Sequence, residues 1–384
     1  MASDTHQSVS EGGAAVVARC QLPETLPLWR QPPDGDEAKV WAALHPFFAQ
    51  RGYKLWKNDC HFVYSPDVEV VSPDNDVSNG FAYATLFRRD SETEPGTVLH
   101  IFQFMSMNGL CRPARVKDGR DVVIRVLAVG QRGRDHIHIL RHIARGAHAF
   151  YNSNHTIPLF ETVDFEDITF GIFPKVGFGL VDAYGGWAQN SVGDIIDMLR
   201  QCLEALTFLQ AAGVAHRDAF RDNFLIQWHP ESLLAGHSPH SMPRVYLTDF
   251  EVAVQFPEDA TFEDCVVSGI PSGGSFPDDV TQYKRPVPPE VTSGSAYNAF
   301  KMDVWQLGKS YEDFQSTIPK IDELLEAMRD PESERRPDST YALSYLAEVL
   351  SSIPPKSLLI PPVILPSPYD HLVPKSVLDM PVSG

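Results

Sequence analysis

The sequence predicts a mixed α+β fold in which a strand-rich part precedes a helix-rich part. Short runs of β-branched and aromatic residues, among them Val122–Val126 and Ile168–Val176, are typical of strands. Further along, the apolar side chains of Ile195–Leu209 recur at helical spacing, and Ser191 with Asp194 forms the capping-box pattern that begins a helix. A chain of 384 residues can hold one large domain with tails or two ordinary domains.

Composition and charge limit the partners and the compartment. The formal charge is −18, from 50 acidic and 32 basic residues, which disfavours nucleic acid or an anionic membrane as a partner. No apolar run is long enough for a membrane span, and the N-terminus lacks the features of a signal peptide. An odd number of scattered cysteines suits a reducing compartment, so we expect an intracellular protein, cytoplasmic or nuclear; the five are Cys20, Cys60, Cys111, Cys202 and Cys265.

The ends of the chain and the first hundred residues have their own patterns. The start of the chain is small and polar, as in disordered tails, and the proline-rich end predicts an extended tail. Between them, Val40–Phe48 has helical spacing and Tyr53–Trp56 reads as a short strand. Residues 66–99 are rich in Asp, Pro, Ser and Asn, and we expect them to be mostly loop.

The most informative stretch is Val214–Phe224, which reads VAHRDAFRDNF. His216, Arg217 and Asp218 stand together, and Asn223 follows the aspartate by five positions. This is the H-R-D-x-x-x-x-N pattern of a kinase catalytic loop. Phosphoryl transfer needs a carboxylate to accept or orient the proton of the attacking hydroxyl, and an amide oxygen nearby to hold Mg²⁺.

A second motif follows the predicted strand Val245–Thr248. It reads Asp249-Phe250-Glu251, and here the chain resembles the protein kinase superfamily, whose D-F-G motif holds Mg²⁺ on the β- and γ-phosphates of ATP. The resemblance implies that Asp249 is a magnesium ligand. The glycine of the motif is replaced by Glu251.

Three further motifs match the same family in the correct order. Pro288-Pro289-Glu290 resembles the A-P-E that closes the activation segment, and Asp303–Gly308 resembles the D-V-W-S-L-G helix. Arg336-Pro337-Asp338 resembles the late R-P-x element. The resemblance covers Val214 to about Leu350 well and Asp90–Gly213 more weakly. It implies a buried ion pair between Glu290 and Arg336.

The resemblance also implies the architecture, which is a two-lobed kinase-like fold with a small, mainly β lobe and a larger, mainly helical lobe. The expected divisions are a disordered tail over 1–22 and an extension over 23–89 that packs on the small lobe. The small lobe follows over 90–176 and the large lobe over 177–352, before a proline-rich tail over 353–384.

The small lobe departs from the family pattern at the phosphate-binding groups. Arg125 stands where the family has a lysine, and arginine keeps the charge with a longer, planar group. His136 stands at the position of the glutamate that anchors this cation, so Asp135 or another acid would have to turn inward. The family also has a glycine-rich loop, whose backbone approaches the phosphates. Here Gly109 stands nearly alone in that region, and Cys111-Arg112-Pro113 stands where glycines are expected.

The first functional hypothesis is a divergent protein kinase that transfers the γ-phosphoryl group of ATP to Ser, Thr or Tyr of a protein whose identity the sequence does not give. Asp218 would be the catalytic base, Asn223 and Asp249 the Mg²⁺ ligands, and Arg125 a clamp on the phosphates of ATP. A phosphate on the activation segment would pair with Arg217; the candidate hydroxyls are Thr261, Ser268, Ser272, Ser275 and Thr281.

Two alternatives remain open. The first is a pseudokinase that acts as a binding or scaffold module, which the changes at Arg125, His136 and Glu251 favour. Phe220 adds to that case, because the family usually has a cation two residues after the catalytic aspartate. The second is a small-molecule phosphotransferase, since some of these enzymes carry a D-F-E motif like that at Asp249, although they generally lack the three downstream motifs.

Overall fold

The structure of the protein is a computed structural model. Of the expected tails, residues 1–17 and 366–384 lie outside the residues that the structure describes. Those residues are 18–32, 37–60, 62–66, 85–88, 97–100, 104–176, 178–181, 190–227, 244–277 and 283–365.

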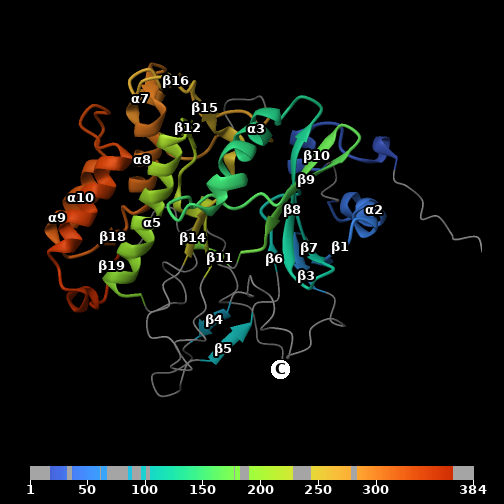
Figure 1. Ribbon diagram of the computed structural model, residues 1–384, viewed down its shortest axis with the longest axis horizontal. Helices are drawn as coiled ribbons and strands as arrows, with labels where there is room; N and C mark the ends of the chain where they lie inside the picture. The colour runs from blue at the N-terminus through green and yellow to red at the C-terminus, as the bar shows by residue number, and fades with distance from the viewer. Residues whose placement is uncertain are drawn as a thin grey trace, which may run out of the picture.

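A five-stranded antiparallel sheet forms the first part of the fold, seen on the right of Figure 1. Its β-branched and aromatic side chains are buried between helices, which explains the strand-like runs in the sequence. The strands in spatial order are β1 (Tyr53–Leu55), β7 (Cys111–Val116), β8 (Asp121–Val129), β10 (Ile168–Pro174) and β9 (Glu161–Phe165).

One face of this sheet is covered by the N-terminal helices α1 (Leu26–Arg30) and α2 (Glu37–Gln50). Trp29 and Trp41 are fully buried and meet edge to face, with ring centroids 5.8 Å apart. Both rings also pack on Phe170 of β10. Aromatic pairs of this kind add to the free energy gained from burial alone, so the N-terminal helices are an integral part of the core of the sheet.

The other face of the sheet carries Arg125. Because side chains alternate along a strand, burial of Ile124 and Val126 beneath α2 turns Arg125 to the opposite side. There α3 (Arg134–Ile143) lies beside β8 and the turn that begins at Phe250. Figure 1 shows α3 between the sheet and the helical part of the molecule.

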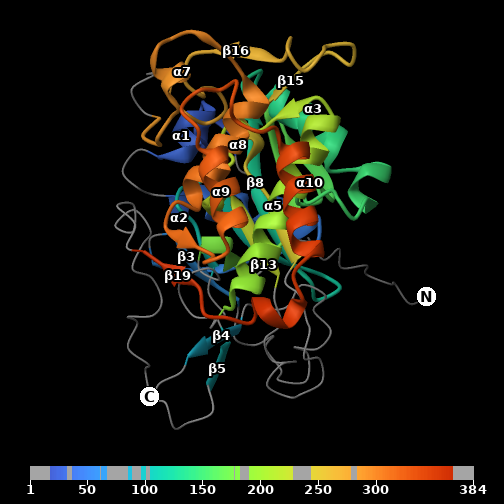
Figure 2. The ribbon, with the colours of Figure 1, turned by 90° about the vertical axis from the view of Figure 1, so that its left-hand side faces the viewer.

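The second part is mainly helical. Ser191 caps α5 (Val192–Ala211) by accepting the Asp194 N–H at 3.2 Å, and the Asp194 carboxylate accepts the Ser191 N–H at 2.7 Å, which confirms the capping box. Apolar side chains of α5 pack against α8 (Ala299–Ser310) and α10 (Ser339–Ser351). Helix α9 (Pro319–Met328) packs against α8 and α10 (Figure 2), and the short helix α7 (Pro289–Thr292) precedes α8.

Small antiparallel sheets complete the described fold. The three-stranded ones are β2 (Lys57–Cys60), β3 (Val63–Ser65) and β6 (Phe104–Met105), and β11 (Phe178–Gly179), β13 (Phe224–Gln227) and β14 (Arg244–Leu247). The two-stranded ones are β4 (Thr85–Arg88) with β5 (Thr97–His100), β12 (Val214–Ala215) with β15 (Val254–Gln255), β16 (Val266–Ser268) with β17 (Ala296–Asn298), and β18 (Phe314–Gln315) with β19 (Val363–Ile364).

The structure confirms the mixed α+β class and corrects one detail. Within residues 66–99, which were expected to be mostly loop, the described residues 85–88 and 97–99 form β4 and the start of β5. Cys111 begins strand β7 and is paired with Arg125 across the sheet, so it lies in a strand and not in a phosphate-binding loop. None of the described helices combines the length and apolar content needed to cross a bilayer.

Candidate active site

The site is built on the turn that follows β12. His216 is fully buried there, and its Nε2–H donates to the Thr248 carbonyl at 2.9 Å. Its Nδ1 accepts the backbone N–H of Asp218 at 3.2 Å. Burial lowers the pKa of His216 to about 4, so the ring is neutral at physiological pH. The His216 ring therefore links the turn at Asp218 to the backbone at Thr248.

Side chains of helix α8 hold the backbone of this turn through hydrogen bonds. Arg217 has a left-handed backbone, with φ of 64°, which is uncommon for a residue with a side chain. The buried Asp303 carboxylate accepts the backbone N–H of His216 at 2.8 Å and that of Arg217 at 2.6 Å. One helical turn later, Gln306 accepts the Ala219 N–H and donates to the Arg217 carbonyl, both at 2.9 Å. These contacts position Asp218.

Asp218 lies at the centre of a hydrogen-bond network. Asn223 donates from Nδ2 to the Asp218 carboxylate and to its backbone carbonyl, each at 2.7 Å. The Tyr283 hydroxyl donates to Oδ1 at 2.7 Å, and Nε of Arg285 lies 3.2 Å from the same oxygen. Burial nevertheless raises the pKa of Asp218 from 3.8 to about 6. A carboxylate with a pKa in this range is suited to general-base chemistry near neutral pH.

Arg285 supplies a positive charge next to Asp218. Its guanidinium lies 5.1 Å from the centre of the Phe220 ring and also pairs with Asp222 at 2.6 Å. Phe220 occupies the position at which the sequence comparison led us to expect a cation. A positive charge is therefore present beside Asp218, but it comes from Arg285, which lies 67 residues after Asp218 in the chain.

Asp249 and Arg125 form a direct ion pair. Nη2 of Arg125 donates to Oδ1 of Asp249 at 2.6 Å, which joins the sheet to the turn beneath it. Burial, the largest single effect, would raise the pKa of Asp249, but the Arg125 charge together with His136, Arg30 and His216 holds that pKa below its ordinary value. Asp249 has φ of 67°, a left-handed conformation that aims its side chain back toward the sheet.

Glu251 is a second, buried acid on the same guanidinium. Its Oε2 lies 3.7 Å from Arg125, and its Oε1 accepts from Nη1 of Arg30 at 2.8 Å. Oε2 also accepts the backbone N–H of Ser275 at 3.0 Å and its hydroxyl. Gly274 permits this approach, because a Cβ there would lie 2.7 Å from the Glu251 side chain. Glu251 thus connects α1, β8 and the loop at Ser275.

Of the two possibilities for the anchor of Arg125, Asp135 or another acid, the structure supports another acid. Asp135 is exposed and does not turn inward, because it lies on the outer side of α3. His136 is buried, and burial together with the nearby Arg125 charge lowers its pKa to about 3. A neutral imidazole cannot anchor a guanidinium, so the anchoring acids are Asp249 and Glu251.

The structure brings together all four residues that the sequence singled out and adds others. Asp218 and Asn223 are hydrogen-bonded to each other, and Asp249 is paired with Arg125. Sequence reasoning missed Arg30, Tyr283 and Arg285, and it named Ser275 only as a candidate for phosphorylation, whereas the structure bonds it to Glu251. The aromatic residue in place of a cation at position 220 was a signal that a compensating charge should be sought in the activation segment. Arg217, expected to meet a phosphate, donates to the carbonyls of Val252 and Ile270 at 3.5 and 3.4 Å.

The donor atoms fit a hard divalent cation held together with phosphates. Both N–H groups of the Asn223 amide are used on Asp218, which leaves its carbonyl oxygen as the atom that could ligate a metal ion. The Asp249 carboxylate has a depressed pKa and is therefore ionised at neutral pH. One carboxylate and one amide oxygen are typical protein ligands for Mg²⁺, which takes its remaining ligands from phosphates and water.

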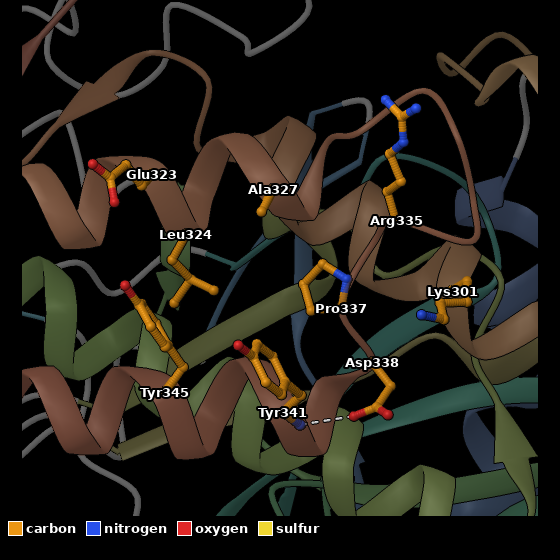
Figure 3. Close-up of a pocket in the computed structure, with 9 residues that line it drawn as sticks. All are labelled: Lys301, Glu323, Leu324, Ala327, Arg335, Pro337, Asp338, Tyr341 and Tyr345. Carbon is orange, nitrogen blue, oxygen red and sulfur yellow. Dashed lines mark hydrogen bonds between the residues drawn. The ribbon is translucent and has the colours of Figure 1, made fainter.

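A separate pocket of about 540 Å³ opens between α9 and α10 (Figure 3). Tyr341 and Tyr345 are stacked along one side of it, with ring centroids 6.2 Å apart. None of the four site residues lines this pocket; those that do are Lys301, Glu323, Leu324, Ala327, Arg335, Pro337, Asp338, Tyr341 and Tyr345. It is therefore not the place at which the acids converge.

No family model matches the chain, and a search of curated proteins found no match. The functional argument accordingly rests on the geometry of the residues around Asp218 and Asp249.

Proposed function

We propose that the protein is a divergent kinase that transfers the γ-phosphoryl group of ATP to a hydroxyl of a protein. Its fold, in this proposal, is the two-lobed kinase type, with the sheet and α3 as the small lobe and the helices from α5 onward as the large lobe. The observation that carries the proposal is that Asp218 is hydrogen-bonded to Asn223 and Asp249 is paired with Arg125, with Asp249 close enough to Asp218 for its charge to raise the Asp218 pKa.

Asp218 has the properties of the base. Its carboxylate already accepts a hydroxyl hydrogen bond at 2.7 Å, which is the geometry that proton abstraction requires. With a pKa of about 6, it is mostly ionised at pH 7 and can still take a proton from an alcohol as charge leaves the oxygen. Asn223 and the backbone contacts from α8 keep this carboxylate in one orientation.

Arg125 and Glu251 form the group that would meet the phosphates of ATP. A kinase needs a cation for the phosphates and a carboxylate to anchor it. In this chain the cation is a guanidinium on β8, and Glu251 lies 3.7 Å from it, so Glu251 would be the anchoring acid when Asp249 holds Mg²⁺. A planar guanidinium binds two phosphate oxygens at once, which suits a role as a clamp.

The proposal includes Mg²⁺, with Asp249 and Asn223 as the residues that would hold it. The ion would neutralise charge on the phosphate oxygens of ATP. The chain's own contribution is to keep Asp249 ionised through Arg125 and to fix the Asn223 amide through Asp218.

The pseudokinase reading has a specific observation in its favour. Both acids are engaged within the chain, Asp249 with Arg125 and Asp218 with Tyr283 and Arg285. A module that used these residues only for internal contacts would hold them in the same way. The small-molecule phosphotransferase is less well supported, because Glu290 and Arg336 are paired as the protein-kinase motifs imply.

The deciding experiment measures ATP binding and ATP turnover on the same preparations. We expect ATP to raise the melting temperature only in the presence of Mg²⁺. Turnover should fall by roughly 10²-fold or more in Asp218→Asn, because a general base is typically worth 10²–10⁴ in rate. Arg125→Ala should also lose turnover.

The matched controls are exposed residues with the same side chains, Asp259→Asn and Arg120→Ala, which should keep wild-type turnover. Wild-type protein that binds ATP with Mg²⁺ but does not turn it over would favour the pseudokinase. Turnover that survives in Asp218→Asn would show that the activity does not belong to this site.

A further inference from the structure

Helix α1 ends against the loop that precedes β7. The carbonyl of Arg30, the last residue of the helix, accepts the Gly109 N–H at 3.0 Å, and a Cβ on Gly109 would lie 2.7 Å from the Trp29 carbonyl. The Gly109 carbonyl in turn accepts from Nε1 of Trp41 at 2.9 Å. A residue with a side chain would not fit at this position, so the N-terminal helices fix where the loop lies.

The backbone N–H groups of this loop are largely bonded within the chain. That of Gly109 is used on α1, and that of Leu110 donates to the Asn108 side chain at 3.0 Å. The Asn108 N–H donates to the Ser106 hydroxyl at 3.4 Å, and the Ser106 N–H donates at 2.9 Å to a carbonyl in the turn between β2 and β3. Loops that bind phosphates do so with such N–H groups. The charge of a triphosphate must therefore be met here by side chains.

The side chain of Arg30 extends from this loop to Glu251. Its Nη1 donates to Oε1 of Glu251 at 2.8 Å and to the Ser275 hydroxyl at 2.7 Å. The Arg125 guanidinium lies 3.7 Å from Oε2 of the same acid, so two guanidinium groups share one carboxylate. Burial raises the pKa of Asp249, and Arg30 is among the charges that act with Arg125 to lower it. Arg30 is thus a second cation beside the expected Mg²⁺ ligand.

Arg30 also has donors to spare for a ligand. Both of its side-chain hydrogen bonds to residues that the structure describes use Nη1, which leaves Nε and Nη2. The side chain is 27% exposed, so a ligand can reach it. Nε and Nη2 lie on one edge of the planar guanidinium, and an edge of this kind matches two oxygens of a phosphate.

We propose that Arg30 is a phosphate-binding residue of the nucleotide site, supplied by the N-terminal extension in place of the N–H groups already used in the loop at Gly109. The inference rests on the proposed function, which provides ATP as the ligand. Nε and Nη2 of Arg30 donate to phosphate oxygens while Nη1 stays on Glu251. The triphosphate is then held by one guanidinium from α1 and by another, that of Arg125, from β8.

The test compares the dissociation constants of ATP and adenosine, each with Mg²⁺, by isothermal titration calorimetry on the full chain. Arg30→Ala should weaken ATP binding roughly 10- to 100-fold, as expected for lost charge-assisted hydrogen bonds, and change adenosine binding by less than about twofold. Arg30→Lys keeps the charge without the two-donor edge and should fall between. Arg51→Ala is the matched control, because Arg51 is an exposed arginine of the same extension that lies over the Phe47 ring.

A second background separates a contact with phosphate from an effect on Glu251. Arg30→Ala leaves that buried carboxylate without a charged partner, whereas the neutral amide of Glu251→Gln needs none. In the Glu251→Gln background, Arg30→Gln should again weaken ATP binding and leave adenosine binding unchanged. A loss of ATP affinity that occurs only with Glu251 intact would show that Arg30 acts through this acid, and would overturn the inference.

The inference and the proposed function fail in different ways. If wild type turns ATP over and Arg30→Ala binds ATP as tightly as wild type or more tightly, the inference is wrong and the kinase proposal stands. Equal losses for ATP and adenosine would also overturn the inference, because Arg30 would then shape the site as a whole. Arg30-dependent binding of ATP without turnover would support the inference and end the proposed transfer. Wild-type protein that does not bind ATP with Mg²⁺ would end both.

Discussion

Arg30 and Glu251 are 221 residues apart in the chain, and Nη1 of Arg30 donates to Oε1 of Glu251 at 2.8 Å. The same Nη1 donates to the Ser275 hydroxyl at 2.7 Å, and the guanidinium lies 4.3 Å from the centre of the Phe276 ring. A side chain from the N-terminal extension therefore takes part in the site. The extension is more than a cover for the sheet, because Arg30 joins Glu251 to the loop at Ser275 and Phe276.

Arg30→Ala should lower the free energy of unfolding by about 1–3 kcal/mol, since a buried Glu251 carboxylate would lose a charged hydrogen bond. Urea unfolding at pH 7 measures the change. Arg120→Ala is the control, because its pair with Asp118 is exposed to solvent and should contribute less than about 1 kcal/mol. Equal effects in the two variants would mean that the Arg30 contact is not formed in solution.

Glu251→Gln tests the anchor of Arg125. If Asp249 is drawn to Mg²⁺ when ATP binds, Glu251 is the acid that keeps Arg125 in position, so we expect kcat/KM for ATP turnover to fall by roughly 10- to 100-fold. This corresponds to about 1.5–3 kcal/mol for a charge-assisted hydrogen bond. Glu258→Gln, an exposed acid in the same segment, should have wild-type kinetics. An unchanged kcat/KM in Glu251→Gln would leave Arg125 without its proposed anchor.

The pH dependence of activity follows from Asp218. Its pKa is about 6 and the base must be ionised, so kcat/KM should be lost as pH falls through about 6. The Arg285 charge lowers this pKa, and Arg285→Ala should therefore move the acidic limb to higher pH. The exposed neighbour Lys284→Ala is the control and should keep the limb in place. A limb that does not move in Arg285→Ala would contradict the role given to that guanidinium.

The Asp218 carboxylate should also make the free energy of unfolding depend on pH. The folded pKa of Asp218 lies above its ordinary 3.8, so its contribution to stability is present below about pH 4 and is lost as pH rises through about 6. Relative to Asp218→Asn, wild type should lose about 2 kcal/mol of unfolding free energy between pH 4 and 7. Urea titrations of both proteins at the two pH values give this difference. A pH-independent difference would place the folded pKa near 3.8.

Arg336→Ala should destabilise the protein by about 3–5 kcal/mol, because it leaves Glu290 as an uncompensated, largely buried charge. Arg336 has no exposed side-chain surface, and Nη1 lies 2.9 Å from Oε1 of Glu290. The adjacent Arg335 is 67% exposed, so Arg335→Ala should change the melting temperature little. Comparable melting temperatures for the two variants would argue against the buried pair.

The sequence was sufficient to predict the parts of the site that lie in short motifs. The pair of Glu290 and Arg336 is confirmed, because it follows from two motifs whose roles are independent of the rest of the chain. The capping box at Ser191 could likewise be predicted from the sequence, because all of its atoms come from four successive residues. Asp218 and Asn223 meet for a similar reason, being five positions apart on one tight turn.

The contacts that sequence reasoning missed join distant segments. Nothing near Glu251 in the chain indicates that its partners are Arg30 and Ser275, because these come from α1 and from a loop. Likewise, Tyr283 and Arg285 are distant from Asp218 in the sequence and contact it only in the folded chain. Such contacts depend on how the parts pack together, which hydrophobic periodicity and motif spacing do not encode.

The bonds between Asp303 and the turn at His216 also bear on the order of folding. The left-handed backbone at Arg217 is unfavourable by itself and is held by a carboxylate 86 residues further along the chain. Closing a loop of that length is slow compared with forming α5 or α8 from neighbouring residues. The turn at Asp218 should therefore take its final shape only after α8 has docked, so that in a nascent chain this turn stays unformed until the C-terminal half is in place.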